Sequence, residues 1–297
     1  MKKQKFAKQD YTRSMLPQTR KAIFFDVVQL QWKNLVLLGL ILLLLYVPVV
    51  LVTMLRDLMQ ADIYLSMQNS GDAAQLTAQD SIVYLQLFHG ILLIPLMALF
   101  SVALSGVLRV IRQYAWEENV HMTTDLGRGI RDNYRHTAAI TTLGAVIYVL
   151  CLMVYHSASA YQNAIFSLFS LLPVGISVLV VLPIFAIALA MVPVYTNSLW
   201  TTIKNAFYVY CRSLLKVLLA LICSLLPWAA TFIPNFYCHI FGSLAGALLT
   251  PFCLLAWTLF CYNQFDKHIN PDVSPQLVGK GIVRNTEGGN NAEGHAR

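Results

Sequence analysis

The chain has 297 residues, of which 57% are hydrophobic and only 12% are charged, and its formal net charge is +7. Soluble domains carry roughly 25% charged residues, whereas the stretch from Thr137 to Ile203 contains no Asp, Glu, Lys or Arg. These values exclude a soluble domain, because only a lipid bilayer can hold so long an apolar stretch. Nucleic-acid binding is not expected, because the basic residues flank apolar segments and no soluble domain presents them as a stripe.

Six apolar segments follow one another, each close to the roughly 20 residues that cross a bilayer core as a helix. We expect membrane spans at residues 35–55, 82–107, 139–155, 173–194, 214–232 and 240–262. The fourth span is the hardest to delimit, because apolar character already begins at Ala164. We place its start at Pro173, whose fixed φ suits a first helical turn, and interpret residues 164–172 as an interfacial lead-in.

The basic residues indicate the orientation of these spans. If the N-terminus is cytoplasmic, all 21 Lys and Arg residues except Arg56 fall in cytoplasmic segments. Such segments of membrane proteins are enriched in Lys and Arg. Both ends of the chain are basic, which favours an even number of spans. We therefore predict a multi-pass protein of the cell (plasma) membrane with both termini in the cytoplasm.

A stretch with helical spacing of apolar residues precedes each odd-numbered span. These stretches are residues 23–33, 124–133 and 198–210. Helices of this kind lie in the headgroup plane with their apolar face toward the lipid. The predicted fold is an all-α integral membrane protein with six transmembrane helices arranged as three hairpins, each preceded by a cytoplasmic amphipathic helix.

Three parts of the chain follow from this pattern. Residues 1–33 form a basic cytoplasmic N-terminal segment with an interfacial helix, and residues 34–265 form the six-helix membrane domain. Residues 266–297 are polar and rich in Gly and Asn, so we expect a disordered cytoplasmic tail.

The segment around the end of the second span carries a pattern of Gly, Arg, Tyr, acidic and Asn residues: Gly106, Arg109, Arg112, Tyr114, Glu118, Asp125, Arg131 and Asn133. With this pattern it resembles the YesL-like family of bacterial multi-pass membrane proteins, a domain of unknown function. Family members have a Gly-Glu pair after an arginine-bearing helix end, where this sequence has Glu117 and Glu118. Some members resemble accessory components encoded beside carbohydrate-uptake ABC systems. The resemblance therefore implies a role in carbohydrate transport as an accessory protein.

Gln86 and His89 form a candidate intramembrane polar pair, three residues apart in the second span. Polar groups in hydrocarbon are costly and usually face a bundle interior or water. The pair could belong to a substrate pathway or a proton relay. It could also make an ordinary hydrogen bond between helices, or reach the outer interface.

A candidate cytoplasmic docking face follows the second span. Its residues are Arg109, Arg112, Arg128, Arg131 and Arg135, and the last three share a helical face. Arginines in this position can bind an acidic partner or lipid phosphates, or they can form a solvated positive loop.

No catalytic or metal-binding motif is present. The HExxH, GxSxG and GxxxxGK[ST] signatures are absent, and the six cysteines contain no CxxC pair. We therefore predict a non-enzymatic protein without cofactors, and the resemblance to YesL-like proteins implies that it serves a carbohydrate-uptake (ABC-type) system. Its expected partners are the lipid bilayer and other membrane transport subunits. The alternative is a stand-alone small-molecule transporter that uses the polar patch around Gln86 and His89.

Overall fold

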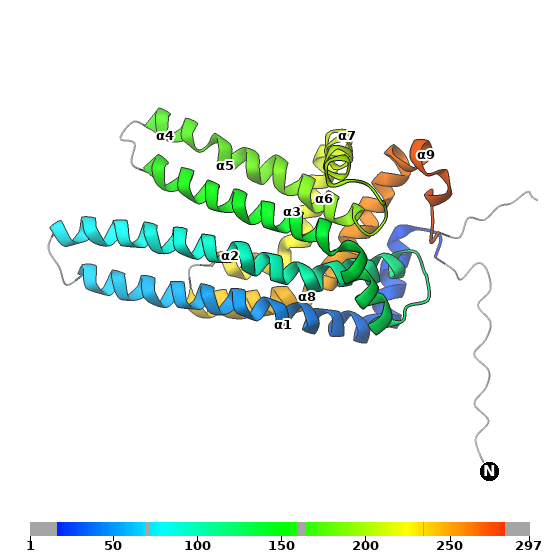
Figure 1. The fold of residues 1–297 in the computed structure, drawn as a ribbon, viewed down its shortest axis with the longest axis horizontal. Coiled ribbons are helices and arrows are strands. Elements are labelled where there is room, and N and C mark those ends of the chain that lie inside the picture. The colour runs from blue at the N-terminus through cyan, green and yellow to red at the C-terminus, as the bar shows by residue number, and fades with distance from the viewer. Residues whose placement is uncertain (1–16, 69–71, 160–163, 234, 283–297) are drawn as a thin grey trace, which may run out of the picture.

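The computed structural model of the protein describes residues 17–68, 72–159, 164–233 and 235–282, and these residues are helical apart from short connections (Figure 1). The long helices are α1 (Arg20–Gln68), α2 (Asp72–Ala115), α3 (Met122–Ser159), α7 (Leu199–Leu225) and α8 (Phe236–His268). The shorter ones are α4 (Ala164–Ser170), α5 (Leu172–Ile176), η2 (Ser177–Val181), α6 (Leu182–Met191), η3 (Leu226–Phe232), α9 (Asn270–Val273) and η4 (Pro275–Leu277).

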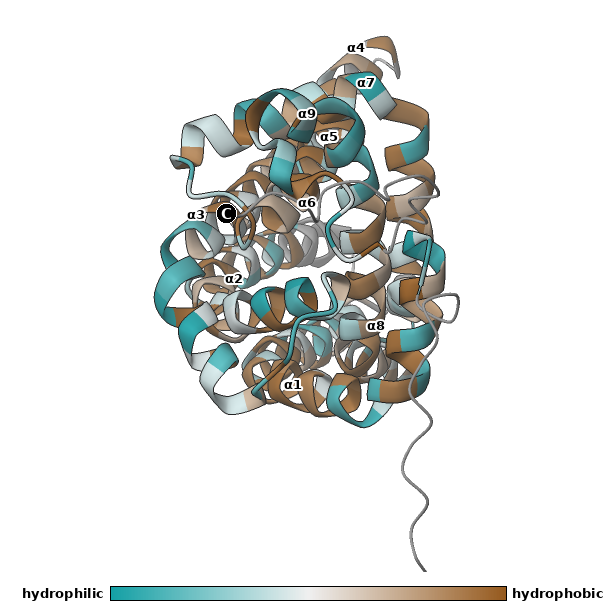
Figure 2. Cartoon of the chain, turned by 90° about the vertical axis from the view of Figure 1, so that its right-hand side faces the viewer, coloured by the Kyte–Doolittle hydropathy of each residue, from teal (hydrophilic) through white to brown (hydrophobic). Residues whose placement is uncertain are grey.

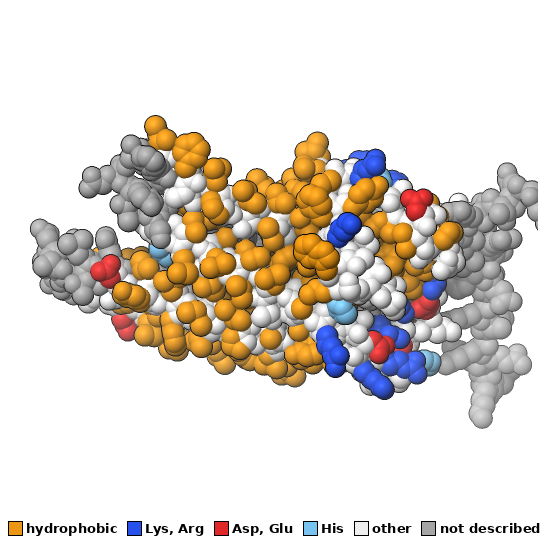
Figure 3. Space-filling view, turned by 45° about the horizontal axis from the view of Figure 1, so that its top comes forward, with side chains coloured by type: hydrophobic (Ala, Val, Ile, Leu, Met, Phe, Trp, Pro, Cys, Tyr) orange, Lys and Arg blue, Asp and Glu red, His pale blue; other side chains and the backbone are white. Residues whose placement is uncertain are grey.

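Six helical segments of the described chain are long and apolar enough to cross a membrane. They are α1, α2, α3, the run from Leu168 to Met191, α7 together with η3 as far as Thr231, and α8. Hydrophobic side chains cover the middle of the molecule, and Lys and Arg gather at one end (Figure 3). The all-α prediction and the six apolar helices are confirmed, and they fit a multi-pass membrane protein.

The helices are arranged around the bundle almost in chain order. α1 packs against α2 and α8, α2 against α3, α6 against α7, and α7 against α8. Glycines allow close approaches between long helices: a Cβ on Gly39 of α1 would overlap the carbonyl oxygen of Leu248 in α8, and one on Gly129 of α3 would lie 2.9 Å from the Cα of Gly106 in α2. The backbones therefore touch where a side chain would separate them.

We call the end of the bundle that carries the start of α1, the α2–α3 connection and the last described residues the basic end. The opposite end, with the end of α1 and the start of α2, is the far end (Figure 1). Figure 2 looks onto the basic end, where hydrophilic residues gather on α9 and on the ends of the longer helices.

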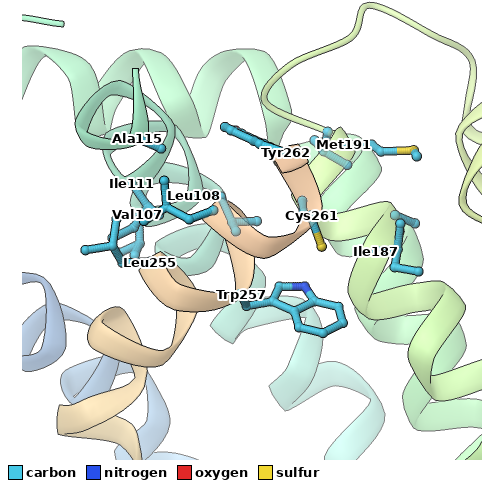
Figure 4. Packing of buried hydrophobic residues seen from close by; sticks show 14 of the residues in the cluster. Val107, Leu108, Ile111, Ala115, Ile187, Met191, Leu255, Trp257, Cys261 and Tyr262 are labelled. Carbon is cyan, nitrogen blue, oxygen red and sulfur yellow. The ribbon is translucent and has the colours of Figure 1, made fainter. Parts of the chain in front are cut away.

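Near the basic end, α2, α6 and α8 meet in a buried apolar core (Figure 4). Its members include Val107, Leu108, Ile111, Ala115, Ile187, Met191, Leu255, Trp257, Cys261 and Tyr262. The indole nitrogen of Trp257 donates a hydrogen bond to the carbonyl oxygen of Ala186 at 2.9 Å. The ring can therefore be buried without leaving its N–H group unsatisfied.

Two of the long helices are kinked. Gln31 in α1 and Ser213 in α7 have non-helical backbone angles, so each helix consists of a first arm before and a second arm after that residue. The first arms contain most of the stretches 23–33 and 198–210 that we expect to be interfacial helices, whereas α3 has no break after residues 124–133. The hairpin pattern and the interfacial placement stay predictions.

The fourth candidate span begins at Leu168, earlier than the expected start at Pro173. Pro173 lies in the first turn of α5, where its missing N–H group costs nothing, so the helical path continues across it from α4. A π-helical turn, η2, follows within the same span. Hydrophobicity alone does not predict a π-helical turn.

The expectation of a disordered tail is wrong for residues 266–282. α8 continues to His268, α9 and η4 follow, and Ile282 packs against the apolar core. Polar side chains hold this segment, because the Tyr195 hydroxyl donates to Asn270 Oδ1 at 2.6 Å and Asn270 Nδ2 donates to Asp266 Oδ1 at 2.8 Å. Burial and the nearby Asp266 carboxylate raise the pKa of Tyr195, so its hydroxyl stays a donor. Residues 283–297 lie outside the described part.

Candidate functional site

A polar cluster lies between α1, α2 and α8 toward the far end. His89, which is 4% exposed, places Nε2 at 3.1 Å from the Thr53 hydroxyl oxygen. The Thr53 hydroxyl also donates to the carbonyl oxygen of Val49 at 2.8 Å. The described contact of His89 is thus with Thr53 of α1 rather than with Gln86, which is half-buried on the same helix. The structure does not join the two predicted residues into one pair.

Charged groups extend this cluster. Asp57 accepts a hydrogen bond from Nε of the neighbouring Arg56 at 2.9 Å, and its second oxygen lies 3.2 Å from His239 Nδ1 of α8. The adjoining cavity, bordered by Thr53, Asp57 and His239, has a volume of only about 10 Å³. That space holds about one water molecule. The cluster in this conformation can pair charges or hold a proton, but it is too small for an organic substrate.

No motif in the sequence indicates that Thr53, Asp57 and His239 meet. Thr53 and Asp57 lie one turn apart on α1, His239 lies on α8 far along the chain, and all three are close to the ends of predicted spans. The only sequence signal was their similar depth: Asp57 follows the first span and His239 precedes the sixth.

The predicted arginine face divides into two groups. Arg128, Arg131 and Arg135 are exposed on α3, at spacings of three and four residues that place them on one side of the helix. Arg109 of α2 reaches α3 and pairs through Nη1 with Asp132 Oδ2 at 2.8 Å. We call Arg128, Arg131 and Arg135 the arginine face.

Arg112 does not belong to that face, so the prediction is wrong for this residue. Its Nη1 donates to the carbonyl oxygen of Pro193 at 2.9 Å, its Nη2 lies 3.4 Å from Glu118, and its guanidinium stacks 4.7 Å from the Trp116 ring centroid. Five residues, 194–198, separate Pro193 from the start of α7 at Leu199, and no motif in the sequence marks the Pro193 carbonyl as an arginine acceptor. Its position depends on the fold of α6 against α2.

Arg20, like Arg112, has hydrogen-bond partners within the chain, and it connects the two ends of the described chain. Arg20 donates through Nη2 to Asp266 at 2.8 Å and through Nη1 to the carbonyl oxygen of Lys280 at 2.7 Å. Lys280 in turn places Nζ 2.7 Å from Glu118 and 3.9 Å from the Trp116 ring centroid. Gly281 has φ of +85°, and a Cβ there would meet the carbonyl oxygen of Ala115 at 2.7 Å, so the chain can lie directly on the end of α2.

We call Arg20, Arg112, Glu118, Asp266 and Lys280 the inner charge network. Its side chains connect the start of α1, the end of α2, the end of α8 and the last described residues. Sequence reasoning missed it, because its acidic members lie in loops and helix ends that carry no motif.

Two apolar cavities lie on the side of α3 opposite to the arginine face. Two cavities of about 350 and 380 Å³ lie between α3 and the α5–α6 run, and both are bordered by Gly144, Tyr148, Leu182 and Phe185. The walls are almost entirely hydrophobic side chains of α3 and of the span from Leu168 to Met191, and the larger cavity is also bordered by Leu93 and Met97 of α2. Lipid chains can fill such a space without any specific contact.

Together these features define a class, the polytopic α-helical membrane protein with a charged network at one end and a small polar cluster toward the other. No family model, curated protein or solved structure matches the chain. Within the described residues, no group of three or more His, Cys, Asp or Glu side chains is placed to hold a metal ion.

Proposed function

We propose that the protein is a non-enzymatic accessory component of the cell membrane that docks a partner through the arginine face of α3. The observation that supports the proposal is the difference among the arginines near the α2–α3 connection. Arg109 and Arg112 have acidic partners within the chain, whereas Arg128, Arg131 and Arg135 are exposed. Exposed guanidinium groups on one helix face can bind carboxylates or phosphates in pairs.

The proposed orientation places the basic end in the cytoplasm. Both described chain ends lie there, since Arg20 contacts the backbone of Lys280, and an even number of spans brings the two ends to one side. Positive residues favour the cytoplasmic side of membranes. In this orientation the first arms of α1 and α7 would lie along the inner surface, and each pair of successive spans would form a hairpin.

The partner we propose is another membrane transport subunit, in line with the resemblance to YesL-like proteins and their carbohydrate-uptake context. The arginine face requires a partner surface with acidic side chains. Anionic lipid headgroups offer the same chemistry, so the test has to separate a protein from a lipid.

The test is affinity capture of the full-length protein from detergent-solubilised membranes. The variant Arg128→Ala/Arg131→Ala/Arg135→Ala is compared with Lys204→Ala/Arg212→Ala/Lys216→Ala, which removes three exposed basic residues of α7. We expect the first variant to lose a defined partner that the second keeps. Identical partner profiles for the wild type and both variants would refute docking through the arginine face.

A stand-alone transporter is the second candidate function. Its support is the far-end cluster, in which the Nδ1 atom of His89 is buried and has no hydrogen-bond partner among the described residues. Such an atom can accept or release a proton near Asp57 and His239. The test is uptake into vesicles by His89→Ala and by Gln86→Ala, and unchanged flux in both would leave this function without its residues.

A further inference from the structure

A polar cavity of about 400 Å³ lies at the basic end between α1 and the α2–α3 connection. Its lining residues include Asp26, Val27, Leu30, Gln31, Asn34, Tyr114, Glu117, Glu118 and Val120. Small-molecule sites have volumes of about 300–1,000 Å³. The cavity is therefore large enough for a small organic molecule, and it is separate from the arginine face and from the far-end cluster.

Three carboxylates line this polar cavity, and within the described residues only one of them pairs with a cation. Glu118 is bound by Lys280 at 2.7 Å and lies 3.4 Å from Arg112. Asp26, from α1, and Glu117, from the α2–α3 connection, take part in no ion pair within the described residues. Two negative charges on different walls of one cavity thus remain uncompensated, and they favour a cationic ligand over an anionic one.

Tyr114 provides an independent observation at the same cavity. It is 5% exposed, and its hydroxyl has no partner with hydrogen-bond geometry in the described part of the chain. The hydroxyl lies near the side chain of Asn34, which donates one of its two amide N–H groups to Gln31 Oε1 at 2.7 Å. Buried hydroxyl groups normally have a partner. A ligand with N–H donors would supply one.

The apolar part of the cavity lining indicates which kind of cation the polar cavity can bind. Val27, Leu30 and Val120 are apolar and accompany the two carboxylates. A divalent metal ion would leave these apolar walls uncovered, and it prefers several converging oxygen ligands. No such metal-binding group is present in the described residues. An ammonium group has three donors and no acceptor, which suits a carboxylate, and methylene groups suit Val and Leu side chains.

We propose that the polar cavity binds an aliphatic diamine or polyamine, with one ammonium group at Asp26, a second at Glu117 and the methylene chain against Val27, Leu30 and Val120. The ligand would also bring N–H donors within reach of the Tyr114 hydroxyl. Burial and the nearby Asp26 carboxylate raise the pKa of Glu117. A bound ammonium group reverses this repulsion, so binding strengthens as the pH rises through the pKa of Glu117.

The experiment is isothermal titration of the full-length protein in phosphatidylcholine nanodiscs, which carry no net charge to attract amines. The titrants are 1,4-diaminobutane, spermidine, 1-aminobutane and magnesium chloride. We expect saturable binding of the two polyvalent amines, and at least tenfold weaker binding of 1-aminobutane, which has one ammonium group. Magnesium should not compete at the same concentration.

The variants locate the binding. Asp26→Asn/Glu117→Gln should weaken diamine binding at least tenfold, whereas the control Asp62→Asn/Asp272→Asn, which removes two exposed carboxylates elsewhere, should bind like the wild type. Tyr114→Phe should weaken binding several-fold. The thermal unfolding of each variant without ligand shows whether it is folded. The proposal is overturned if the wild type binds no diamine, if the folded Asp26/Glu117 variant binds like the wild type, or if magnesium displaces the diamine at equal concentration.

Discussion

The inner charge network and the arginine face lie at the same end of the molecule, yet their arginines have different surroundings. The side chains of Arg20 and Asp266 are 9% and 13% exposed and contact each other at 2.8 Å. Arg128, Arg131 and Arg135 are exposed on α3, at the end where Lys and Arg gather on the surface (Figure 3). Breaking a buried pair leaves an uncompensated charge, whereas exposed charges contribute little to stability. The same residue type therefore supports the fold in one region and is available to a partner in the other.

The largest effect is expected when the inner charge network loses one carboxylate. Asp266→Ala leaves the enclosed guanidinium of Arg20 without its anion, and Asn270 without an acceptor. We expect the free energy of unfolding in detergent to fall by about 3 kcal/mol. Asp272→Ala, which removes an exposed carboxylate of α9, is the control. Equal losses in the two variants would contradict the difference between buried and exposed charges.

Packing beneath the arginine face gives the next largest effect. Gly129→Ala inserts a Cβ that would lie 2.9 Å from the Cα of Gly106, so α2 and α3 have to move apart. Overpacking of this kind destabilises a protein by about 1–3 kcal/mol. The midpoint of thermal unfolding, which Gly129→Ala should lower, measures this effect. A Cβ at Gly127 meets nothing within 4 Å, and Gly127→Ala should be neutral. A neutral Gly129→Ala would show that the two helices are not in close contact.

A smaller loss is expected at the edge of the inner charge network. Lys280→Ala removes the contact with Glu118 and the stacking on Trp116, but Lys280 is about one-third exposed, with 37% of its side chain accessible. We expect the free energy of unfolding to fall by about 1 kcal/mol. Lys267→Ala, an exposed lysine of α8, should have no measurable effect on chemical unfolding. If Lys280→Ala lowered the free energy of unfolding as much as Asp266→Ala, the exposure of these side chains would not determine their contribution to stability.

The smallest effect on stability is expected at the arginine face itself. Arg128→Ala/Arg131→Ala/Arg135→Ala should change the free energy of unfolding by less than about 0.5 kcal/mol per residue, as surface substitutions do. The same variant is expected to lose its partner in affinity capture. Strong destabilisation would place these arginines with the inner charge network and remove the basis of the comparison.

Hydrophobicity and charge predicted much of this fold. The six apolar segments and the all-α class follow from composition, because a membrane-spanning helix requires a long apolar stretch. The kinks at Gln31 and Ser213, the π-helical turn of η2 and the order of residues 266–282 did not follow, because they depend on tertiary contacts such as that of Ser213 with Gln264 at 2.8 Å.

The candidate sites were less predictable. His89 was identified as a costly polar residue in a span, but its partner Thr53 lies on another helix. Arg112 and Arg128 look alike in the sequence, and only the fold shows that the first faces Pro193 while the second faces outward. Asp26 and Glu117 lie on different elements, α1 and the α2–α3 connection, and only the fold shows that they line one cavity.

The central claim is that six helices cross the membrane and that the arginine face is cytoplasmic. Alkaline phosphatase, which is active only outside the cytoplasm, and green fluorescent protein, which is fluorescent only within it, test this as fusions after Gly71 and after Gly127. We predict an active phosphatase at the first position and a fluorescent protein at the second. If both positions report the same compartment, α2 does not cross the membrane and the proposed docking face is lost.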